Sequence, residues 1–271
     1  MSPPHRSEFG PLTGPSARDP GAVDYDEMWR HVYGDVAEWG ATHRHMRRII
    51  RRLLAGIRYD SVLDVGCGPG GNFEILSRDR SLAYVAGADI SAFALQQARA
   101  AHHAHFFKLD IERERLGGAW DLVTSFLLLE HLEDDVAALR NLRAMTRKYV
   151  LLSTIAGDYE RYKRWDAKVG HVRNYAVGEL ERKLEQLGFR VAAAIYWGFP
   201  FYAPLTRTLQ NYADPKMGGH RLMRLVGRVF SELAYLLYFL NSSRRGDLLV
   251  VLAHAPEVRG PGHVAGVAQA P

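Results

Sequence analysis

The apolar residues near the start of the chain recur at the spacing of a helix. Two runs follow one another at intervals of mostly three and four: Trp29, Tyr33, Val36 and Trp39, then Met46, Ile49, Ile50, Leu53 and Leu54. Residues spaced in this way share one face of a helix, so the pattern predicts helices between residues 24 and 57. Gly40 and Gly56 are expected to interrupt them.

After residue 60 the pattern alternates between short β-branched runs and longer helical ones. The expected strands are 61–65, 83–88, 105–109, 121–126, 149–154, 190–197 and 248–254, and the expected helices are 71–78, 92–101, 134–145 and 177–187. Strands that alternate with helices form a mostly parallel, doubly wound sheet with right-handed crossovers. The sequence therefore predicts an α/β fold of Rossmann-like type.

Residues 199–244 do not follow this alternation and form a helical insertion before the last strand. Its apolar positions fall on one helical face, with Arg221, Arg224 and Arg228 nearby: Leu222, Val226, Phe230, Leu233 and Leu237. We expect most of this helix to pack on the sheet, and an interfacial helix near anionic lipid is the alternative. The charges of Arg224, Arg228 and Glu232 argue against a transmembrane span, although weak peripheral membrane contact stays open.

The two ends of the chain are rich in proline, glycine and polar residues. We expect disordered tails at 1–23 and 256–271 and one domain over 24–255, with the N-terminal helices at 24–57. The mild net charge of +5 is dispersed, so nucleic-acid binding is not indicated. A single cysteine rules out an internal disulfide and a cysteine-based zinc site, and no metal site is expected. No secretory leader is evident, so the predicted location is cytoplasmic.

A glycine-rich turn follows the first expected strand. It reads Asp64-Val-Gly66-Cys67-Gly68-Pro-Gly70-Gly71. Glycines at such a turn let the backbone bend tightly and approach a ligand. Gly66, Gly68 and Gly71 also satisfy the dinucleotide pattern G-x-G-x-x-G, so the turn alone does not distinguish between nucleotide cofactors.

Three carboxylates at the ends of successive strands make the prediction more specific. Asp64 lies beside the turn, Asp89 ends the second strand and Asp110 ends the third. Asp89 is placed to accept ribose hydroxyls, and Asp110 to accept an adenine amino group. An acidic rim would repel a pyrophosphate but suits the ammonium and sulfonium of S-adenosylmethionine (SAM).

With these motifs the chain resembles the class I SAM-dependent methyltransferases, in particular their small-molecule group. The resemblance covers about Asp60 to Phe189 and includes the 120–132 segment and His171-Val-Arg-Asn-Tyr175. It implies a seven-stranded sheet whose last strand is antiparallel. It also implies a cofactor site made of Asp64, Gly66, Cys67, Gly68, Gly70, Asp89, Ile90, Asp110, Ile111, Ser125 and Phe126.

The acceptor side is less defined. The resemblance places Tyr25, Trp29 and Tyr33 in an N-terminal lid, and Arg173 and Tyr175 in the late segment that faces the acceptor. Methyl transfer from a sulfonium depends mainly on alignment, and a general base matters when the acceptor is a hydroxyl or an ammonium. The candidates for that base are Glu130, His131 and His171.

Missing motifs narrow the choice of acceptor. The stretch after the fourth strand is Ser-Phe-Leu-Leu, without the Pro-Pro tetrapeptide of adenine or glutamine methylation, and there is no Pro-Cys nucleophile. A small organic acceptor methylated on O or N is the prediction, with an apolar, glycan or lipid-linked molecule among the options. A SAM-binding protein without catalysis and a nicotinamide-dependent oxidoreductase are the alternatives. The sequence does not indicate an oligomeric state.

Overall fold

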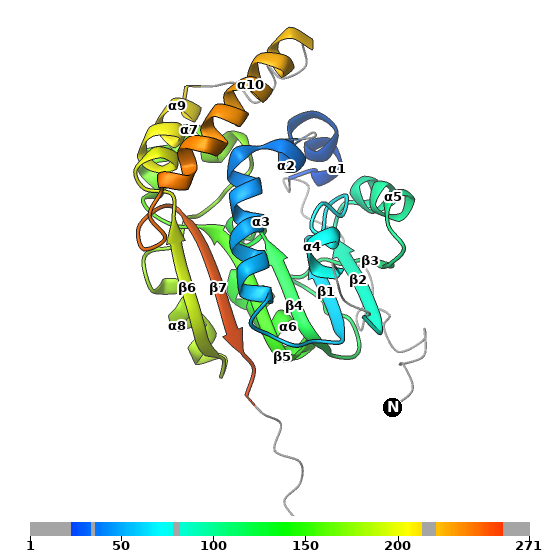
Figure 1. Cartoon of the computed structure of the whole chain (residues 1–271). Coiled ribbons are helices and arrows are strands. Elements are labelled where there is room, and N and C mark those ends of the chain that lie inside the picture. Colours follow the sequence, from blue (N-terminus) through cyan, green and yellow to red (C-terminus); the bar gives the residue numbers. More distant parts are fainter. Residues whose placement is uncertain (1–22, 34–35, 78–81, 213–220, 257–271) are drawn as a thin grey trace, which may run out of the picture.

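The computed structural model describes residues 23–33, 36–77, 82–212 and 221–256. The tails expected at 1–23 and 256–271 lie outside these residues, except for Val23 and Pro256. One seven-stranded sheet organises the described chain (Figure 1). No described helix is long and apolar enough to cross a membrane.

The sheet has the strand order β3-β2-β1-β4-β5-β7-β6. Its strands are β1 (Ser61–Val65), β2 (Tyr84–Asp89), β3 (His105–Lys108), β4 (Trp120–Phe126), β5 (Thr146–Ile155), β6 (Arg190–Trp197) and β7 (Leu248–His254). Neighbours from β3 to β5 pair in parallel, whereas β7 runs antiparallel to both β5 and β6. The predicted Rossmann-like sheet with an antiparallel last strand is therefore confirmed.

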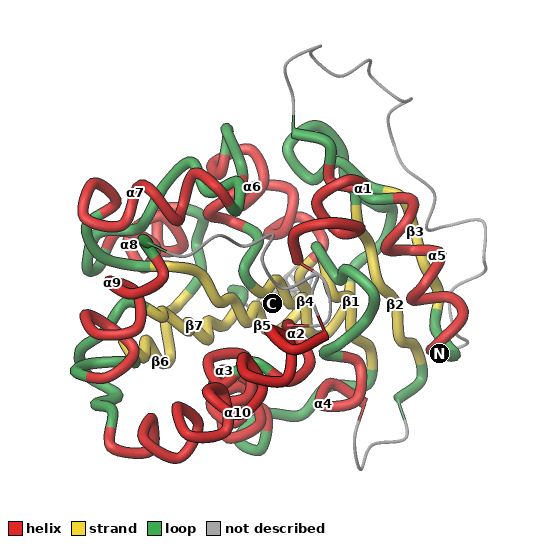
Figure 2. Tube along the Cα trace, turned by 90° about the horizontal axis from the view of Figure 1, so that it is seen from above, coloured by secondary structure: helices red, strands yellow, loops and turns green. Residues whose placement is uncertain are grey.

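Helices cover both faces of the sheet (Figure 2). On one face lie α3 (Ala41–Leu54), α4 (Phe73–Ser77) and α10 (Arg221–Leu237), and on the other lie α6 (Asp135–Met145) and α8 (Glu179–Gln186). Each face has its own apolar core, one around Ile50 and Leu122 and the other around Leu139 and Val123. Since all residues of the central strand β4 are buried, the sheet is shielded from water on both sides.

Further helical segments complete the described part of the chain. They are α1 (Tyr25–Met28), a π-helical turn (Trp29–Tyr33), α2 (Val36–Trp39), α5 (Ala92–Ala101), a 3-10 turn (Leu129–His131), α7 (Tyr159–Lys168), a second π-helical turn (Phe201–Thr206), α9 (Arg207–Gln210) and a last 3-10 turn (Tyr238–Leu240). Side-chain caps fix several starts: Ser91 accepts from Ala94 N at 3.0 Å and Asp134 from Ala137 N at 2.9 Å.

The predicted helices and strands agree with the structure, apart from some of their first and last residues and one helix that was not predicted. Gly40 is the N-cap of α3, and Gly56 follows its end, as expected. β5 extends beyond the expected 149–154 at both ends, and α4 is shorter than the expected 71–78. Helix α7 was not predicted, because its residues Tyr159–Lys168 are mostly charged and only Tyr162 and Asp166 are buried.

The expectation that the helix in the 199–244 insertion packs mostly on the sheet is wrong. Its inner face carries Ser231 and Ala234, which are buried like Tyr238 in the 3-10 turn that follows, and α10 packs against α3. Its outer face is apolar and exposed: Val226, Val229, Phe230, Leu233, Leu236 and Leu237. Small residues allow close contact between helices, so the side with the large aliphatic residues faces solvent.

Candidate active site

The glycine-rich turn lies at the carboxyl end of β1 and is pinned to the end of β2. The amide groups of Gly66 and Cys67 both donate to the Ala88 carbonyl, at 2.7 and 3.1 Å. Gly66, Gly68 and Gly70 have φ of +73°, +53° and +94°, a conformation that favours glycine. A Cβ on Gly66 would lie 2.9 Å from Leu128 Cδ2. The turn therefore depends on glycine for both conformation and space.

Asp64 is buried beneath this turn with one carboxylate oxygen unpaired. Thr124 Oγ1 donates to its Oδ1 at 2.6 Å, and Oδ2 has no hydrogen-bond partner in the described part of the chain. Burial raises the pKa of Asp64 to about 7, and the charge of Asp89 adds to this effect. A buried oxygen without a partner suits a cationic ligand group, which would supply the missing donor.

Asp89 and Asp110 follow at the ends of the next two strands. Asp89 accepts from the Gly68 and Ser91 amides, both at 2.8 Å, so the acid and the turn hold each other in place. Burial raises the pKa of Asp89. Asp110 is more exposed and accepts from the Glu112 amide at 3.2 Å. The three acids occupy one edge of the sheet, as their sequence positions predict.

The other expected cofactor residues surround this edge but differ in exposure. Cys67 packs with Phe73 and Leu95 below the turn, and burial raises the pKa of its thiol. Ile111 and Phe126 are also buried, whereas Ile90 is partly exposed. The Ser125 hydroxyl is buried and has no hydrogen-bond partner among the described residues. Their roles toward a cofactor remain predictions.

The N-terminal segment, residues 24–33, crosses the same edge. Asp26 accepts from Ser91 Oγ at 2.5 Å and from the Phe93 amide at 3.1 Å. The indole of Trp29 lies against Gly68, where a Cβ would overlap the ring. Tyr25 and Tyr33 donate to the carbonyls of His131 at 3.4 Å and Val169 at 3.2 Å. The segment thus joins the glycine turn to the region after β4.

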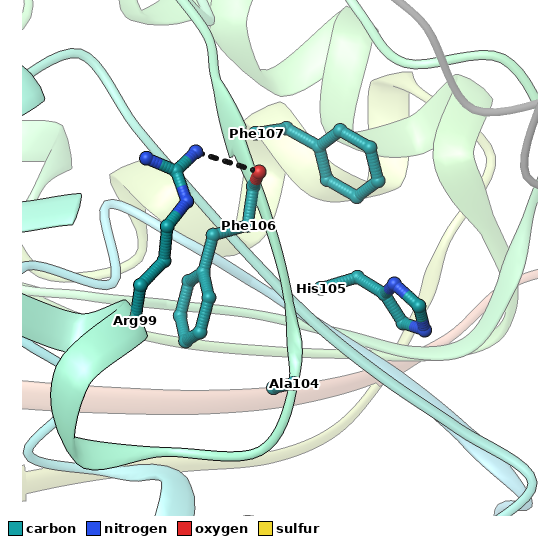
Figure 3. Close-up of a pocket in the computed structure, with 5 residues that line it drawn as sticks. All are labelled: Arg99, Ala104, His105, Phe106 and Phe107. Carbon is teal, nitrogen blue, oxygen red and sulfur yellow. Dashed lines mark hydrogen bonds between the residues drawn. The ribbon is translucent and has the colours of Figure 1, made fainter. Parts of the chain in front are cut away.

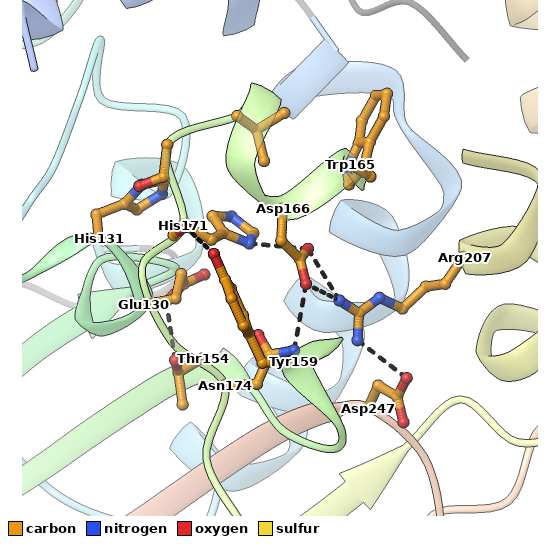
Figure 4. A network of polar contacts seen from close by, with 12 residues as sticks. Glu130, His131, Thr154, Tyr159, Trp165, Asp166, His171, Asn174, Arg207 and Asp247 are labelled. Atoms are coloured by element: carbon orange, nitrogen blue, oxygen red, sulfur yellow. Dashed lines mark hydrogen bonds and ion pairs between the residues drawn. The ribbon is translucent and has the colours of Figure 1, made fainter. Parts of the chain in front are cut away.

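Beside this segment, the three candidate bases gather in one place (Figure 4). Glu130, His131 and His171 each offer a ligand or proton-accepting atom, and these atoms lie within 4.8 Å of one another. The His131 and His171 rings meet edge to face with centroids 4.7 Å apart. Burial and the neighbouring His171 lower the pKa of His131 to about 3, so its imidazole is neutral at pH 7. Burial raises the pKa of Glu130, an effect that His171 opposes.

Comparison with known proteins identifies the family of the chain. A family model described as a methyltransferase domain matches residues 37–194, which is more than half of the chain and runs from α2 into β6. The chain belongs to the class I SAM-dependent methyltransferases. SAM is therefore its cofactor, and the nicotinamide-dependent alternative is set aside.

One curated protein and several solved structures are similar to this chain. A 99-residue stretch of this methyltransferase is 34% identical to a trans-aconitate 2-methyltransferase from Enterobacter sp. (strain 638), and it covers 39% of that protein and 35% of this chain. A magnesium protoporphyrin IX methyltransferase from Synechocystis PCC 6803, solved with bound S-adenosylhomocysteine (SAH), is similar at a TM-score of 0.51 and 17% identity, covering 79% of this chain and 84% of that one.

A methyltransferase from Haloferax volcanii, solved in complex with the Trm112 activator, is similar at a TM-score of 0.58 and 17% identity. The match covers 89% of this chain and all of that one. At these identities, the solved structures establish the fold alone.

Behind the histidines of the methyltransferase lies a buried ion network that sequence reasoning missed. Asp166 accepts a hydrogen bond from His171 Nδ1 at 3.1 Å. Its two carboxylate oxygens also accept from Arg207 Nη2, at 2.9 and 2.8 Å. Arg207 Nη1 then reaches Asp247 at 3.0 Å (Figure 4). Asp166 lies on the unpredicted helix α7 and Arg207 in the insertion, so no local pattern connects them.

Arg173 and Tyr175, expected on the acceptor side, both bind Asp135 at the start of α6. The Tyr175 hydroxyl donates to Asp135 Oδ2 at 2.6 Å, and Arg173 Nη1 lies 2.6 Å from Oδ1. Tyr175 is completely buried. The structure therefore does not bring these two side chains into the Glu130–His131–His171 group, and both help to anchor the late segment to α6.

A recess of about 300 Å³ lies elsewhere, along the edge strand β3 (Figure 3). Arg99, Ala104, His105, Phe106 and Phe107 line it, and Arg99 donates to the Phe106 carbonyl at 3.0 Å. None of the residues expected in the cofactor or acceptor site belongs to this lining, so the recess lies apart from the predicted site.

Proposed function

We propose that this methyltransferase transfers the methyl group of SAM to an oxygen or nitrogen of a small organic acceptor. The observation that carries the proposal is the N-terminal segment, which lies across the carboxyl edge of the sheet with Trp29 on the glycine turn and Tyr25 and Tyr33 on the loops beside His131. A site closed in this way excludes water from the sulfonium and fits a small molecule better than a duplex or a folded protein.

In this proposal the acids of the rim hold the cofactor. Asp64 Oδ2 accepts the ammonium of the methionine part, Asp89 the ribose and Asp110 the adenine side. The positive charge of the ligand stabilises the ionised form of Asp64, whose pKa burial raises to about 7 in the free protein. Cofactor binding at neutral pH is then coupled to loss of the Asp64 proton.

Glu130, His131 and His171 contact the acceptor in this proposal. Two similar proteins are named for small organic acceptors, trans-aconitate and magnesium protoporphyrin IX, which supports the same class here. The three side chains remain our candidates for the group that handles the acceptor proton. The single cysteine, Cys67, is in keeping with a cytoplasmic location, which is part of the proposal.

We further propose that the acceptor is apolar or carried by a lipid. The outer face of α10 exposes Leu233 and Leu236 by 63% and 66%. At its margin, the guanidinium group of Arg48 lies 4.4 Å from the ring centroid of Phe239, whereas that of Arg44, 3.6 Å from the Tyr235 centroid, is paired with Glu232 at 2.7 Å. An apolar face with a basic margin suits the surface of an anionic membrane.

The test is release of SAH from SAM across a panel of small hydroxyl, carboxyl and amine compounds that includes lipid-linked ones. Acceptor-dependent SAH release that follows one chemical class supports the proposal. SAH binding without turnover on any class would instead favour the alternative of a SAM-binding protein without catalysis.

A further inference from the structure

Glu130, His131 and His171 have the composition and spacing of a metal-ligand set. Their ligand atoms, one from each side chain, all lie within 4.8 Å of one another. Donor atoms that share a tetrahedral or octahedral ion at about 2.1 Å lie roughly 3 to 4 Å apart, so a small side-chain rotation closes the set around an ion. Glu130 and His131 come from the turn after β4, and His171 from the loop after α7.

The hydrogen bonds of the two histidines leave Nε2 of each ring available as a ligand atom. His131 Nδ1 lies 3.0 Å from the Gly170 carbonyl, and His171 Nδ1 lies 3.1 Å from the Asp166 carboxylate. Carbonyl and carboxylate oxygens only accept, so both Nδ1 atoms carry the proton and both Nε2 atoms keep their lone pair. Histidines that bind metals are oriented in this way, by a backbone carbonyl or a carboxylate on the second ring nitrogen.

Glu130 supplies an independent indication. Its side chain is completely buried, Oε2 accepts from Thr154 Oγ1 at 2.8 Å, and Oε1 has no hydrogen-bond partner among the described residues. A buried carboxylate oxygen without a donor is costly unless a ligand completes it. The negative charge of the nearby Asp166 is already balanced by Arg207, so a cation at this site would depend on the charge of Glu130.

We propose that Glu130, His131 and His171 bind one divalent transition-metal ion on the acceptor side of the site. Two imidazoles and one carboxylate on one side of an ion suit Zn²⁺, Fe²⁺ or Co²⁺ and leave coordination positions open for water or an acceptor oxygen. Asp166 is a positioning residue that holds the His171 ring. Arg207 keeps Asp166 ionised by donating to both of its carboxylate oxygens.

The catalytic consequence rests on the proposed function. An acceptor hydroxyl bound to the ion loses its proton to solvent, and the resulting oxygen attacks the methyl carbon of SAM. The new O–C bond forms as the C–S bond breaks, and SAH leaves with the electron pair on sulfur. The ion would lower the pKa of the acceptor hydroxyl that it binds.

The test is Co²⁺ titration of the full chain after dialysis against a chelator, without SAM or acceptor, followed by visible absorption and calorimetry. We expect one Co²⁺ per chain, displaced by Zn²⁺. Glu130→Gln and His171→Asn should weaken Co²⁺ binding at least tenfold, and Asp166→Asn should weaken it to a smaller extent. His103→Asn, at an exposed loop position, is the matched control and should bind as the unaltered chain does.

SAH binding, measured on the same samples, shows that each variant is folded. The proposal is overturned if the unaltered chain takes up no stoichiometric Co²⁺, or if the Glu130 and His171 variants that still bind SAH also bind Co²⁺ normally. Failure of the unaltered chain to bind SAH would instead refute the proposed function, while the Co²⁺ stoichiometry would still report on the metal site.

Discussion

Replacing Asp64 by asparagine tests the cofactor site through its electrostatics. The change keeps the size of the side chain and the Thr124 hydrogen bond to Oδ1 but removes the charge. In the folded chain the pKa of Asp64 is about 7 against an ordinary value of 3.8. A difference of one in pKa corresponds to about 1.4 kcal/mol, so holding Asp64 ionised costs the free protein about 4 kcal/mol.

The sign of the pH dependence follows from which state keeps the proton. Between pH 4 and 7 the folded chain holds a proton on Asp64 that the unfolded chain has lost. The free energy of unfolding therefore falls as the pH rises toward 7 and levels off above it, and this group contributes a loss of about 2.5 kcal/mol between pH 5 and pH 8. D64N lacks this contribution.

The assay is urea denaturation of both proteins at pH 5, 6, 7 and 8, without cofactor. The difference between them should change by about 2.5 kcal/mol over that range in favour of D64N, because the other titrating groups cancel. Although D64N gains stability relative to the unaltered chain, its affinity for SAH should be about 10- to 100-fold weaker, because a charged hydrogen bond is lost. Asp121→Asn, at the far end of β4, is the control and should leave SAH affinity unchanged. A pH-independent difference in stability, or normal SAH binding by D64N, would refute the reasoning.

Three further predictions concern the glycine turn, the ion network and α10. Gly68→Ala should lower SAH affinity at least tenfold in calorimetry, because φ is +53° and the methyl would overlap Trp29, whereas Gly71→Ala meets no atom within 4 Å and should bind normally. Arg207→Met leaves the buried Asp166 without its arginine partner, so urea denaturation should show a loss of about 3 to 5 kcal/mol, and a loss below about 1 kcal/mol would contradict the buried ion pair. Serine at both Leu233 and Leu236 should change unfolding by less than about 1 kcal/mol yet abolish co-sedimentation with anionic phospholipid vesicles at low salt, and absence of that binding in the unaltered chain would remove the lipid proposal.

The cofactor edge was predictable because its signals are local. Each acid of the rim lies at or just beyond the carboxyl end of a strand, and parallel strands that end at one edge bring Asp64, Asp89 and Asp110 together without any further information. The glycine turn is equally local, since the left-handed backbone at Gly66, Gly68 and Gly70 is required within the turn itself.

The acceptor side was only partly predictable because it is built by tertiary contacts. Glu130, His131 and His171 were identified one by one, but their meeting depends on α7, whose polar sequence gives little hydrophobic signal. Arg207 reaches Asp166 from the insertion, 41 positions away. A contact between residues so far apart in the sequence leaves no periodic pattern from which it could be predicted.

The exposed face of α10 shows a second reason why part of the structure could not be predicted from the sequence. Helical spacing identifies which residues share a face, but it does not say which face is covered. Here Ser231 and Ala234 allow the helix to approach α3 closely, and the larger residues Phe230 and Leu233 are left exposed. Apolar periodicity alone favoured the wrong side.

The most direct test of the central claim is a crystal structure of the chain with bound SAH. The account predicts that the amino group of SAH lies within hydrogen-bond distance of Asp64 Oδ2 and that the ribose hydroxyls lie on Asp89. SAH bound elsewhere, such as in the recess along β3, or bound at the glycine turn with Asp64 Oδ2 still unpaired, would contradict it.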